Sequence, residues 1–205
     1  MSVYHWIISG SFVFFVMCFV EIMLKTLALK KYYDPSLAKG KVKPAIVFSY
    51  TKAMSPAKKE SAYMHLPTYT AGMIFHLGTF FCFFCLILFF VKISTPIWFS
   101  YLSAILIFSS AVCGIGLLIK RITLAKLRSL SNPDDYFSNL LVTGFQILTA
   151  CSFLDQSIYY VLFIYSSALL IYIPVGKLKH TIYFFADRVH LGKYYGKRGV
   201  WPVEK

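Results

Sequence analysis

The chain has 205 residues, of which 58% are hydrophobic and only 14% are charged. Soluble domains carry about 25% charged residues, so this composition excludes a soluble globular enzyme and a disordered chain. Lysine and arginine number 21 against 8 acidic residues, which gives a net charge of +13. Beside such long apolar runs, this excess is typical of the basic loops of membrane proteins, and we expect no nucleic-acid partner.

Five stretches are long and apolar enough to span a membrane, for which a helix needs about 20 residues. In chain order they cover about residues 3–24, 70–91, 97–119, 136–153 and 157–173. The fifth is expected to continue to about residue 186 as a kinked extension, because Pro174 bends a helix and frees backbone groups. The sequence therefore predicts an all-α integral membrane bundle of five transmembrane helices, forming one domain over residues 1–205.

The distribution of basic residues predicts the orientation of these helices. Nine lysines lie between the first and second helices, four basic residues follow the third, and seven follow the fifth, whereas the opposite side has only Lys92. Cytoplasmic loops carry the excess of Lys and Arg, so the N-terminus is expected outside and the C-terminus in the cytoplasm. The basic loop 25–69 and the basic tail 187–205 then face the cytoplasm, and we expect a multi-pass protein of the cytoplasmic (inner) membrane.

All five cysteines lie within the apolar helices. Cys82 and Cys85 form a C-x-x-C pair, which in a soluble protein is associated with redox or metal chemistry. Here the pair is flanked by Phe-rich sequence, where cysteine usually behaves as a small buried hydrophobic residue. The cysteine spacing matches neither a zinc site nor an iron–sulfur cluster, so we expect this chain to hold no cluster of its own.

Two histidines stand out because they fall on different predicted membrane helices. His76 lies inside the second helix, and an ionisable residue in a transmembrane helix is a functional candidate. His180 lies in the extension of the fifth helix, toward its cytoplasmic end. Because the two helices run in opposite directions, both histidines are expected at a similar depth near the inner interface. Two facing imidazoles can ligate a six-coordinate haem; alternatively, each hydrogen-bonds a neighbouring helix and binds nothing.

Other residues near that depth fit either a haem or an ordinary structural role. Gly78, Gly114 and Gly116 would let a flat macrocycle approach the backbone, or would serve close helix packing. Lys120 and Arg121 end the third helix and would pair with haem propionates, or would set topology and bind anionic lipid. The remaining histidines are expected in interfacial or solvated positions: His5, His65 and His190.

Several motifs near the inner interface occur together. They are Phe75-His76-Leu77-Gly78, Lys120-Arg121 and Pro174-x-x-Lys177-x-x-His180, and the stretch Leu130–Thr143 enters the fourth helix. Combined with five helices and an outside N-terminus, this pattern over about residues 1–195 resembles the cytochrome b (gamma) subunit of respiratory nitrate reductase. It is equally similar to the related membrane cytochrome b subunits of heterodisulfide reductase and of the sulfite-reduction-associated complex.

The resemblance implies a haem b with His76 and His180 as its two axial ligands. The nitrate reductase subunit binds a second haem, through a histidine ten residues after the first ligand and another eighteen residues before the last. Those positions are Leu86 and Leu162 here. Both ligands of the outer haem are missing together, so one haem is expected rather than two.

The resemblance also implies a membrane anchor that is not catalytic alone, an electron-transfer subunit of a quinone-linked respiratory oxidoreductase complex. It would carry electrons between the quinone pool and a cytoplasmic iron–sulfur protein, docked on the basic inner surface and the loop from Lys39 to His65. The segment Ala45–Tyr50 of that loop would lie at this interface or contact lipid headgroups. A quinone is the candidate substrate. We expect it beside the single haem, because an outer site would leave much of a core of about 30 Å without a carrier.

An alternative hypothesis, from a different class of function, is a haem-free membrane anchor or small transporter. In that case the histidines serve packing or proton transfer. An absorbance spectrum distinguishes the two, since only the cytochrome has a reduced b-type band.

Overall fold

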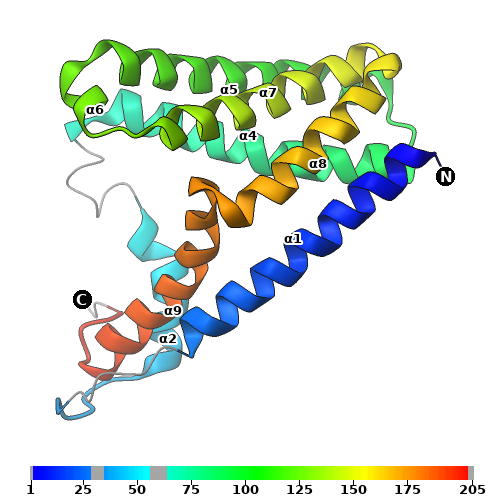
Figure 1. Ribbon diagram of the computed structural model, residues 1–205. Coiled ribbons are helices and arrows are strands. Elements are labelled where there is room, and N and C mark those ends of the chain that lie inside the picture. The colour runs from blue at the N-terminus through cyan, green and yellow to red at the C-terminus, as the bar shows by residue number, and fades with distance from the viewer. Residues whose placement is uncertain (1, 29–34, 56–63, 203–205) are drawn as a thin grey trace. The chain divides into compact units, whose positions relative to one another are not determined.

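The structure is a computed structural model that describes residues 2–28, 35–55 and 64–202, and over these residues it is helical without strands (Figure 1). Five helices are long and apolar enough to span a membrane. They are α1 (Val3–Leu27), α4 (Leu66–Val91), α5 (Ile97–Thr123), α7 (Pro133–Leu154) and α8 (Tyr159–Val175), the last preceded by the 3-10 turn η3 (Gln156–Ile158). The predicted all-α fold with five spanning helices is confirmed, and the chain is a multi-pass membrane protein.

Each apolar run becomes a helix because every backbone N–H and C=O inside lipid must be satisfied within its own segment. The first four of these helices are longer than expected, since their polar ends are not detected by a hydropathy count. α7 begins at Pro133 rather than near residue 136, because Asn132 and Asp135 form a capping box with two hydrogen bonds of 3.0 Å. Proline at the first helical position has no N–H to satisfy and favours the same start.

The end of α4 closes with a residue in the left-handed conformation. The Lys92 N–H donates to the Phe89 carbonyl at 3.2 Å, and the Ile93 N–H donates to the Leu88 carbonyl at 3.0 Å, which makes a Schellman motif. Lys92 has a φ of +58°, a value that favours glycine because glycine has no Cβ. The lysine therefore forms this cap at a conformational cost of about 1 kcal/mol.

The helices form two compact units. The first contains the described residues up to Phe15 and Leu66–Leu178; the second contains the described residues of Val16–His65 and of Lys179–Lys205. Residues of the predicted basic loop and basic tail therefore come together in the second unit. Parts of the loop and the tail lie outside the described residues, namely 29–34, 56–63 and 203–205.

In the first unit α4, α5 and α7 pack most closely, α8 packs against α7, and the short α6 (Ala125–Ser129) connects α5 to α7. Small residues bring the backbones together. A side chain on Gly78 would collide with Ser110, and one on Gly114 would collide with Phe75. Because lipid is as apolar as the helices, close contact through small residues and hydrogen bonds drives their association.

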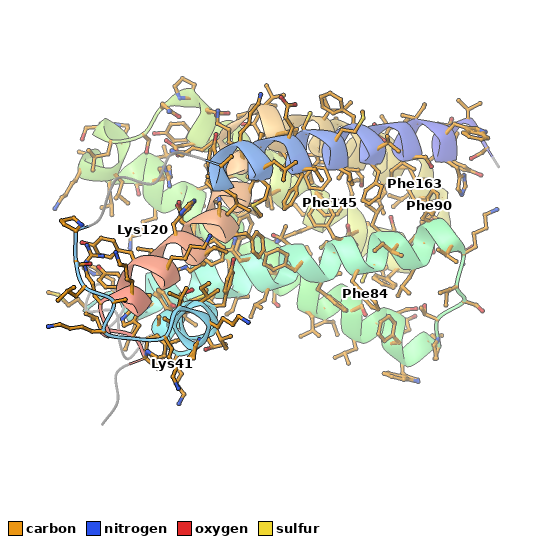
Figure 2. All side chains as sticks on the ribbon, turned by 90° about the horizontal axis from the view of Figure 1, so that it is seen from below. Lys41, Phe84, Phe90, Lys120, Phe145 and Phe163 are labelled. Carbon is orange, nitrogen blue, oxygen red and sulfur yellow. The ribbon has the colours of Figure 1, made fainter. Side chains whose placement is uncertain are left out.

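Aromatic rings fill the space between these helices. Phe83 and Phe145 lie 4.9 Å apart between ring centroids, and Phe89 and Phe153 lie 4.7 Å apart. Such tilted and edge-on pairs are the preferred aromatic geometries. Cys82 on α4 is fully buried, whereas Phe84 on the same helix is half exposed, so α4 has one face in the core and one outside it (Figure 2).

Polar residues of α7 face the interior of the first unit, which explains why this stretch is the least apolar of the five. The Thr149 and Ser152 hydroxyls donate to carbonyls four residues earlier, at 2.7 and 2.8 Å, and so need no partner on another helix. The buried polar residues of α7 are Asp135, Ser138, Thr143, Gln146, Thr149 and Ser152.

The second unit pairs α2 (Val42–Tyr50) with α9 (His180–Lys197) and also contains the second half of α1; the 3-10 turn η1 (Lys52–Met54) follows α2. Gly192 and Gly196 of α9 allow this close approach. A Cβ on Gly192 would lie 2.5 Å from Ile46 Cα, and a Cβ on Gly196 would lie 2.6 Å from Ala45 Cβ. The Ser49 hydroxyl donates to a carbonyl of α9 at 2.8 Å. These contacts make α2 and α9 one tightly packed pair.

A break separates α8 from α9. After Pro174 and Gly176 comes the 3-10 turn η4 (Lys177–Lys179), and α9 then runs to Lys197. The chain after Val175 is therefore helical again, as a separate helix that ends at Lys197 rather than near residue 186, and a kinked continuation of the fifth helix stays a prediction.

Candidate functional site

α4 presents two different faces around His76. Phe75, the preceding residue, has only 8% of its surface exposed, whereas His76 is exposed on the surface of the first unit. The centroids of the two rings lie 6.0 Å apart. The predicted ligand therefore lies outside the packed core of its own unit, on a helix that spans the membrane.

The carbonyl oxygen of Phe75 fixes the rotation of this turn of α4. It accepts hydrogen bonds from the Thr79 hydroxyl at 2.7 Å, the Gln146 amide at 2.9 Å and the Ser110 hydroxyl at 3.4 Å. The Gln146 amide also donates to the Thr79 hydroxyl at 2.9 Å. Side chains from α5 and α7 thus hold the backbone immediately before His76, and this determines which way the imidazole points.

The exposed face of α4 brings together a histidine, an open backbone position and a cation. Thr68, Gly72 and His76 are spaced four residues apart and share that face. A Cβ added at Gly72 would meet nothing within 4 Å, so the surface next to His76 is open. The Lys120 ammonium at the end of α5 donates to the Thr68 hydroxyl, about 12 Å along the helix axis from His76. Exposed apolar side chains surround the imidazole, namely Met73, Leu77 and Phe80.

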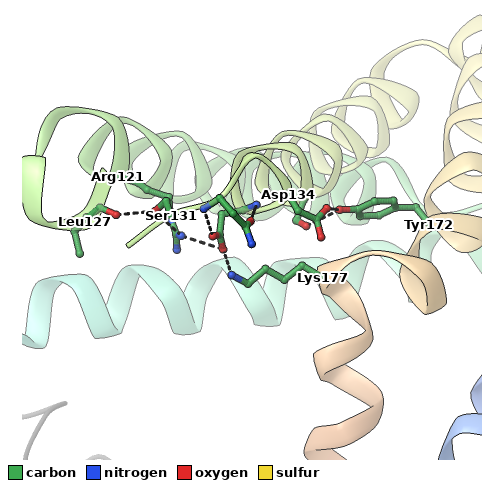
Figure 3. A network of polar contacts seen from close by, with 9 residues as sticks. Arg121, Leu127, Ser131, Asp134, Tyr172 and Lys177 are labelled. Atoms are coloured by element: carbon green, nitrogen blue, oxygen red, sulfur yellow. Dashed lines mark hydrogen bonds and ion pairs between the residues drawn. The ribbon is translucent and has the colours of Figure 1, made fainter. Parts of the chain in front are cut away.

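Arg121 has different surroundings from Lys120, although the two were predicted together as propionate partners. The Arg121 guanidinium pairs with the Asp135 carboxylate at 3.1 Å, and Lys177 pairs with the same carboxylate (Figure 3). The Asp135 side chain is 4% exposed, while those of Arg121 and Lys177 are 40% and 47% exposed. This network joins the end of α5, the start of α7 and the segment that follows α8.

The carboxylate of Asp134, the preceding residue, also accepts a hydrogen bond. The Tyr172 hydroxyl donates to it and lies 2.9 Å from the Ser138 hydroxyl (Figure 3). The Tyr172 ring lies where a side chain on residue 176 would be, so this position favours glycine. Together with the Asp135 network, these contacts fasten the last turn of α8 to the first turns of α7, just before the chain enters α9.

His180, the second predicted ligand, is the first residue of α9 and is exposed in the second unit. It follows Lys177, whose ammonium is held by Asp135, by three residues. His76 and His180 therefore belong to different units, and their pairing at one metal stays a prediction.

The other histidines have varied surroundings. His5 is not solvated, because the residue is only 7% exposed and its ring lies 5.4 Å from that of Phe90 and 5.3 Å from that of Phe163; its interfacial position stays a prediction. No pattern in the sequence indicates this contact, which joins residues far apart in the chain. His190 is half-buried and donates from Nε2 to the Thr26 carbonyl at 3.1 Å, and His65 is exposed.

The two positions that carry the outer ligands in two-haem relatives lie in the core of the first unit. Leu86 is 6% exposed and Leu162 is fully buried, and Phe89 is 5% exposed in the same cluster. Cys82 and Cys85 are fully buried free thiols in this core, as expected of small hydrophobic residues. Side chains thus fill this part of the bundle.

Among the described residues, no group of three or more His, Cys, Asp or Glu side chains is arranged to hold a metal ion. Comparison of the chain with protein-family models, with curated proteins and with solved structures gives no match. The resemblance to membrane cytochromes b therefore stays a prediction from the motifs quoted above.

Proposed function

We propose that this protein is a membrane-anchor cytochrome b subunit that holds one haem b through His76 and His180. It carries electrons between the quinone pool and a cytoplasmic iron–sulfur protein of a respiratory oxidoreductase complex. The observation that carries the proposal is the exposed face of α4, where His76, the open position at Gly72 and the ammonium of Lys120 lie together.

Each residue has a defined task in this proposal. Bound haem b supplies reversible one-electron transfer. His76 and His180 each offer a neutral ring nitrogen to the metal. Lys120 neutralises a propionate through a charge-assisted hydrogen bond, and it is better placed for this than Arg121, which is engaged with a carboxylate of α7.

The hydrogen bonds to the Phe75 carbonyl add a supporting layer behind the ligand. Outer partners that orient a ligating histidine tune both affinity and redox properties. Here Gln146 and Ser110 hold the backbone rather than the imidazole itself. They keep the ligand side of α4 turned away from the packed core of the first unit.

A single haem agrees with the packing of the first unit. Leu86 and Leu162 offer no nitrogen to a metal, and both are buried among other apolar side chains. A second macrocycle between them would have to displace a close-packed cluster, and such cores tolerate little added volume. The quinone is accordingly expected near the one haem, on the side of the membrane where the iron–sulfur partner docks.

The test is the haem content of purified variants. The wild-type protein should show a reduced b-type absorbance band. Replacing His76 or His180 with Ala should abolish or severely reduce haem incorporation, because only one of the two imidazoles that would hold the haem would remain. His65→Ala and His190→Ala serve as matched controls on exposed or half-buried histidines and should retain the band.

The alternative hypothesis predicts the opposite result. A haem-free anchor or small transporter would purify without a b-type band, and all four histidine variants would resemble the wild-type protein. Full haem occupancy in His180→Ala would refute the ligand assignment even if the wild-type protein contained haem.

A further inference from the structure

Basic side chains gather at one end of the α2–α9 pair. Lys39 and Lys41 precede α2, Lys43 lies in its first turn, Lys197 ends α9 and Arg198 follows it; we call these five residues the basic platform. The N–H groups of Lys39 and Gly40 donate to the Lys197 carbonyl at 2.8 and 3.3 Å. Two segments far apart in the sequence therefore meet at the platform, close to Lys41 in Figure 2.

Acidic residues are rare among the described residues around the platform. The described residues over 35–55 and 188–202 contain no Asp or Glu. Asp187 of α9 lies ten residues before Lys197, which is about 15 Å along the helix. At physiological ionic strength the Debye length is about 8 Å, so this carboxylate is largely screened from the platform. The exposed Lys39, Lys41 and Lys43 therefore give this surface a positive potential.

Glycines hold the platform together as one surface. A Cβ on Gly40 would lie 2.5 Å from both the Gly196 carbonyl oxygen and the Gly199 Cα, and a Cβ on Gly196 would lie 3.0 Å from Val42 Cα. Backbone therefore packs directly on backbone at this point. Because the cations sit on a packed backbone rather than on a free loop, little backbone ordering opposes binding to an extended anionic surface.

The second unit itself ties the platform to a membrane surface. His190 in the middle of α9 bonds to Thr26, in the last turn of the spanning helix α1. In Figure 1 both α1 and α9 run toward the lower left, and they approach each other near the end of α1. Lys197 lies seven residues beyond His190, about 10 Å further along the axis. The headgroup layer is of that order of thickness, so we expect the platform within or just beyond it.

Aromatic and apolar side chains are interleaved with the cations. Leu37 is 78% exposed, Tyr194 is 51% exposed and Val200 is 48% exposed. The Arg198 guanidinium lies 3.5 Å from the centroid of the Tyr194 ring. Basic residues mixed with exposed aromatic and apolar ones are typical of segments that lie in a membrane interface. This mixture favours a lipid surface over an acidic protein as the occupant.

We propose that the basic platform docks on anionic phospholipid headgroups of the adjacent leaflet. The proposal does not depend on the haem assignment, because it uses only residues of the second unit. Each lysine or arginine close to an anionic leaflet favours binding by about 1 kcal/mol, which is about fivefold per residue.

The first test is residue-resolved lysine acylation of the full-length protein in nanodiscs, quantified by mass spectrometry. Discs of phosphatidylcholine alone are compared with discs that also contain phosphatidylglycerol. Lys39, Lys41 and Lys43 should react about fivefold more slowly with phosphatidylglycerol present, and high salt should restore their rates. Lys126 of α6 is the control and should change much less. Equal rates for the platform lysines in both kinds of disc would overturn the proposal.

The second test uses variants and spin-labelled lipids. Lys39→Gln, Lys41→Gln and Lys43→Gln are combined, and a charge-matched control combines Lys52→Gln, Lys126→Gln and Arg128→Gln. The wild-type protein and the control should prefer phosphatidylglycerol over phosphatidylcholine severalfold, and the platform variant should lose that preference. Retention of the preference by the platform variant would overturn the proposal. So would protection of the platform lysines only when an acidic soluble protein is added.

Discussion

Substitution of Gly78 by Ala should wedge α4 away from α5. A Cβ at this position would fall inside van der Waals distance of both Oγ and Cβ of Ser110, and Cβ cannot rotate away. Overpacking of this kind costs about 1–3 kcal/mol. Gly72→Ala on the same helix is the matched control, because nothing lies within 4 Å of its added Cβ. Both variants gain the same helix propensity of about 1 kcal/mol, so the difference between them isolates the overpacking cost.

Unfolding can be followed with a thiol-reactive dye in detergent, since Cys82 and Cys85 are fully buried and react only as the bundle opens. Gly78→Ala should unfold several degrees below Gly72→Ala, because 1 kcal/mol corresponds to about 2–4 °C for a chain of this size. Adding Ser110→Gly to Gly78→Ala should recover part of the loss, which a double-mutant cycle would measure as coupling. Equal midpoints for the two glycine variants would refute the assigned α4–α5 contact.

Three further predictions concern other contacts. Asp135→Asn should destabilise the protein by about 2 kcal/mol in the same dye assay, because the half-exposed Arg121 and Lys177 lose their shared carboxylate, whereas exposed Asp187→Asn should change little. Lys92→Gly should stabilise it by about 1 kcal/mol by relieving the left-handed backbone, while Lys92→Ala should give no such gain and should leave quinone-linked haem reduction largely intact. Burial raises the pKa of Tyr50, whose hydroxyl donates to the Phe185 carbonyl at 2.5 Å, so the folded state binds this proton more tightly than the unfolded state. That contribution is present below the ordinary pKa of about 10 and is lost as pH rises above it, and Tyr50→Phe should flatten the alkaline slope of stability measured by denaturant titration.

The spanning helices could be predicted from sequence because an apolar run of sufficient length has one stable backbone structure in lipid. Their ends and partners could not. The start of α7 depends on a capping box between Asn132 and Asp135, which a hydropathy count does not register. The pairing of α2 with α9 depends on Gly192 and Gly196 meeting a helix nearly 150 residues earlier in the chain. Glycines in a sequence indicate close approach without identifying the partner.

The candidate site, too, could be predicted from the sequence only in part. The position of His76 inside a helix followed from hydropathy, but its exposed face depends on Gln146 and Ser110 holding the preceding carbonyl, a contact between three helices. Lys120 and Arg121 are adjacent in sequence, and the sequence alone gives no reason to distinguish them. On a helix adjacent residues point about 100° apart, so one reaches α4 and the other reaches α7.

The central claim is one haem b held by two histidines, and the haem-to-protein ratio of the purified chain tests it most directly. Haem determined as its pyridine haemochrome, against protein determined by amino-acid analysis, should give a ratio near one. Leu86 and Leu162 leave the first unit without a second ligand pair, and the His76→Ala variant should bring the ratio close to zero. A ratio near two, or an unchanged ratio in His76→Ala, would contradict the account.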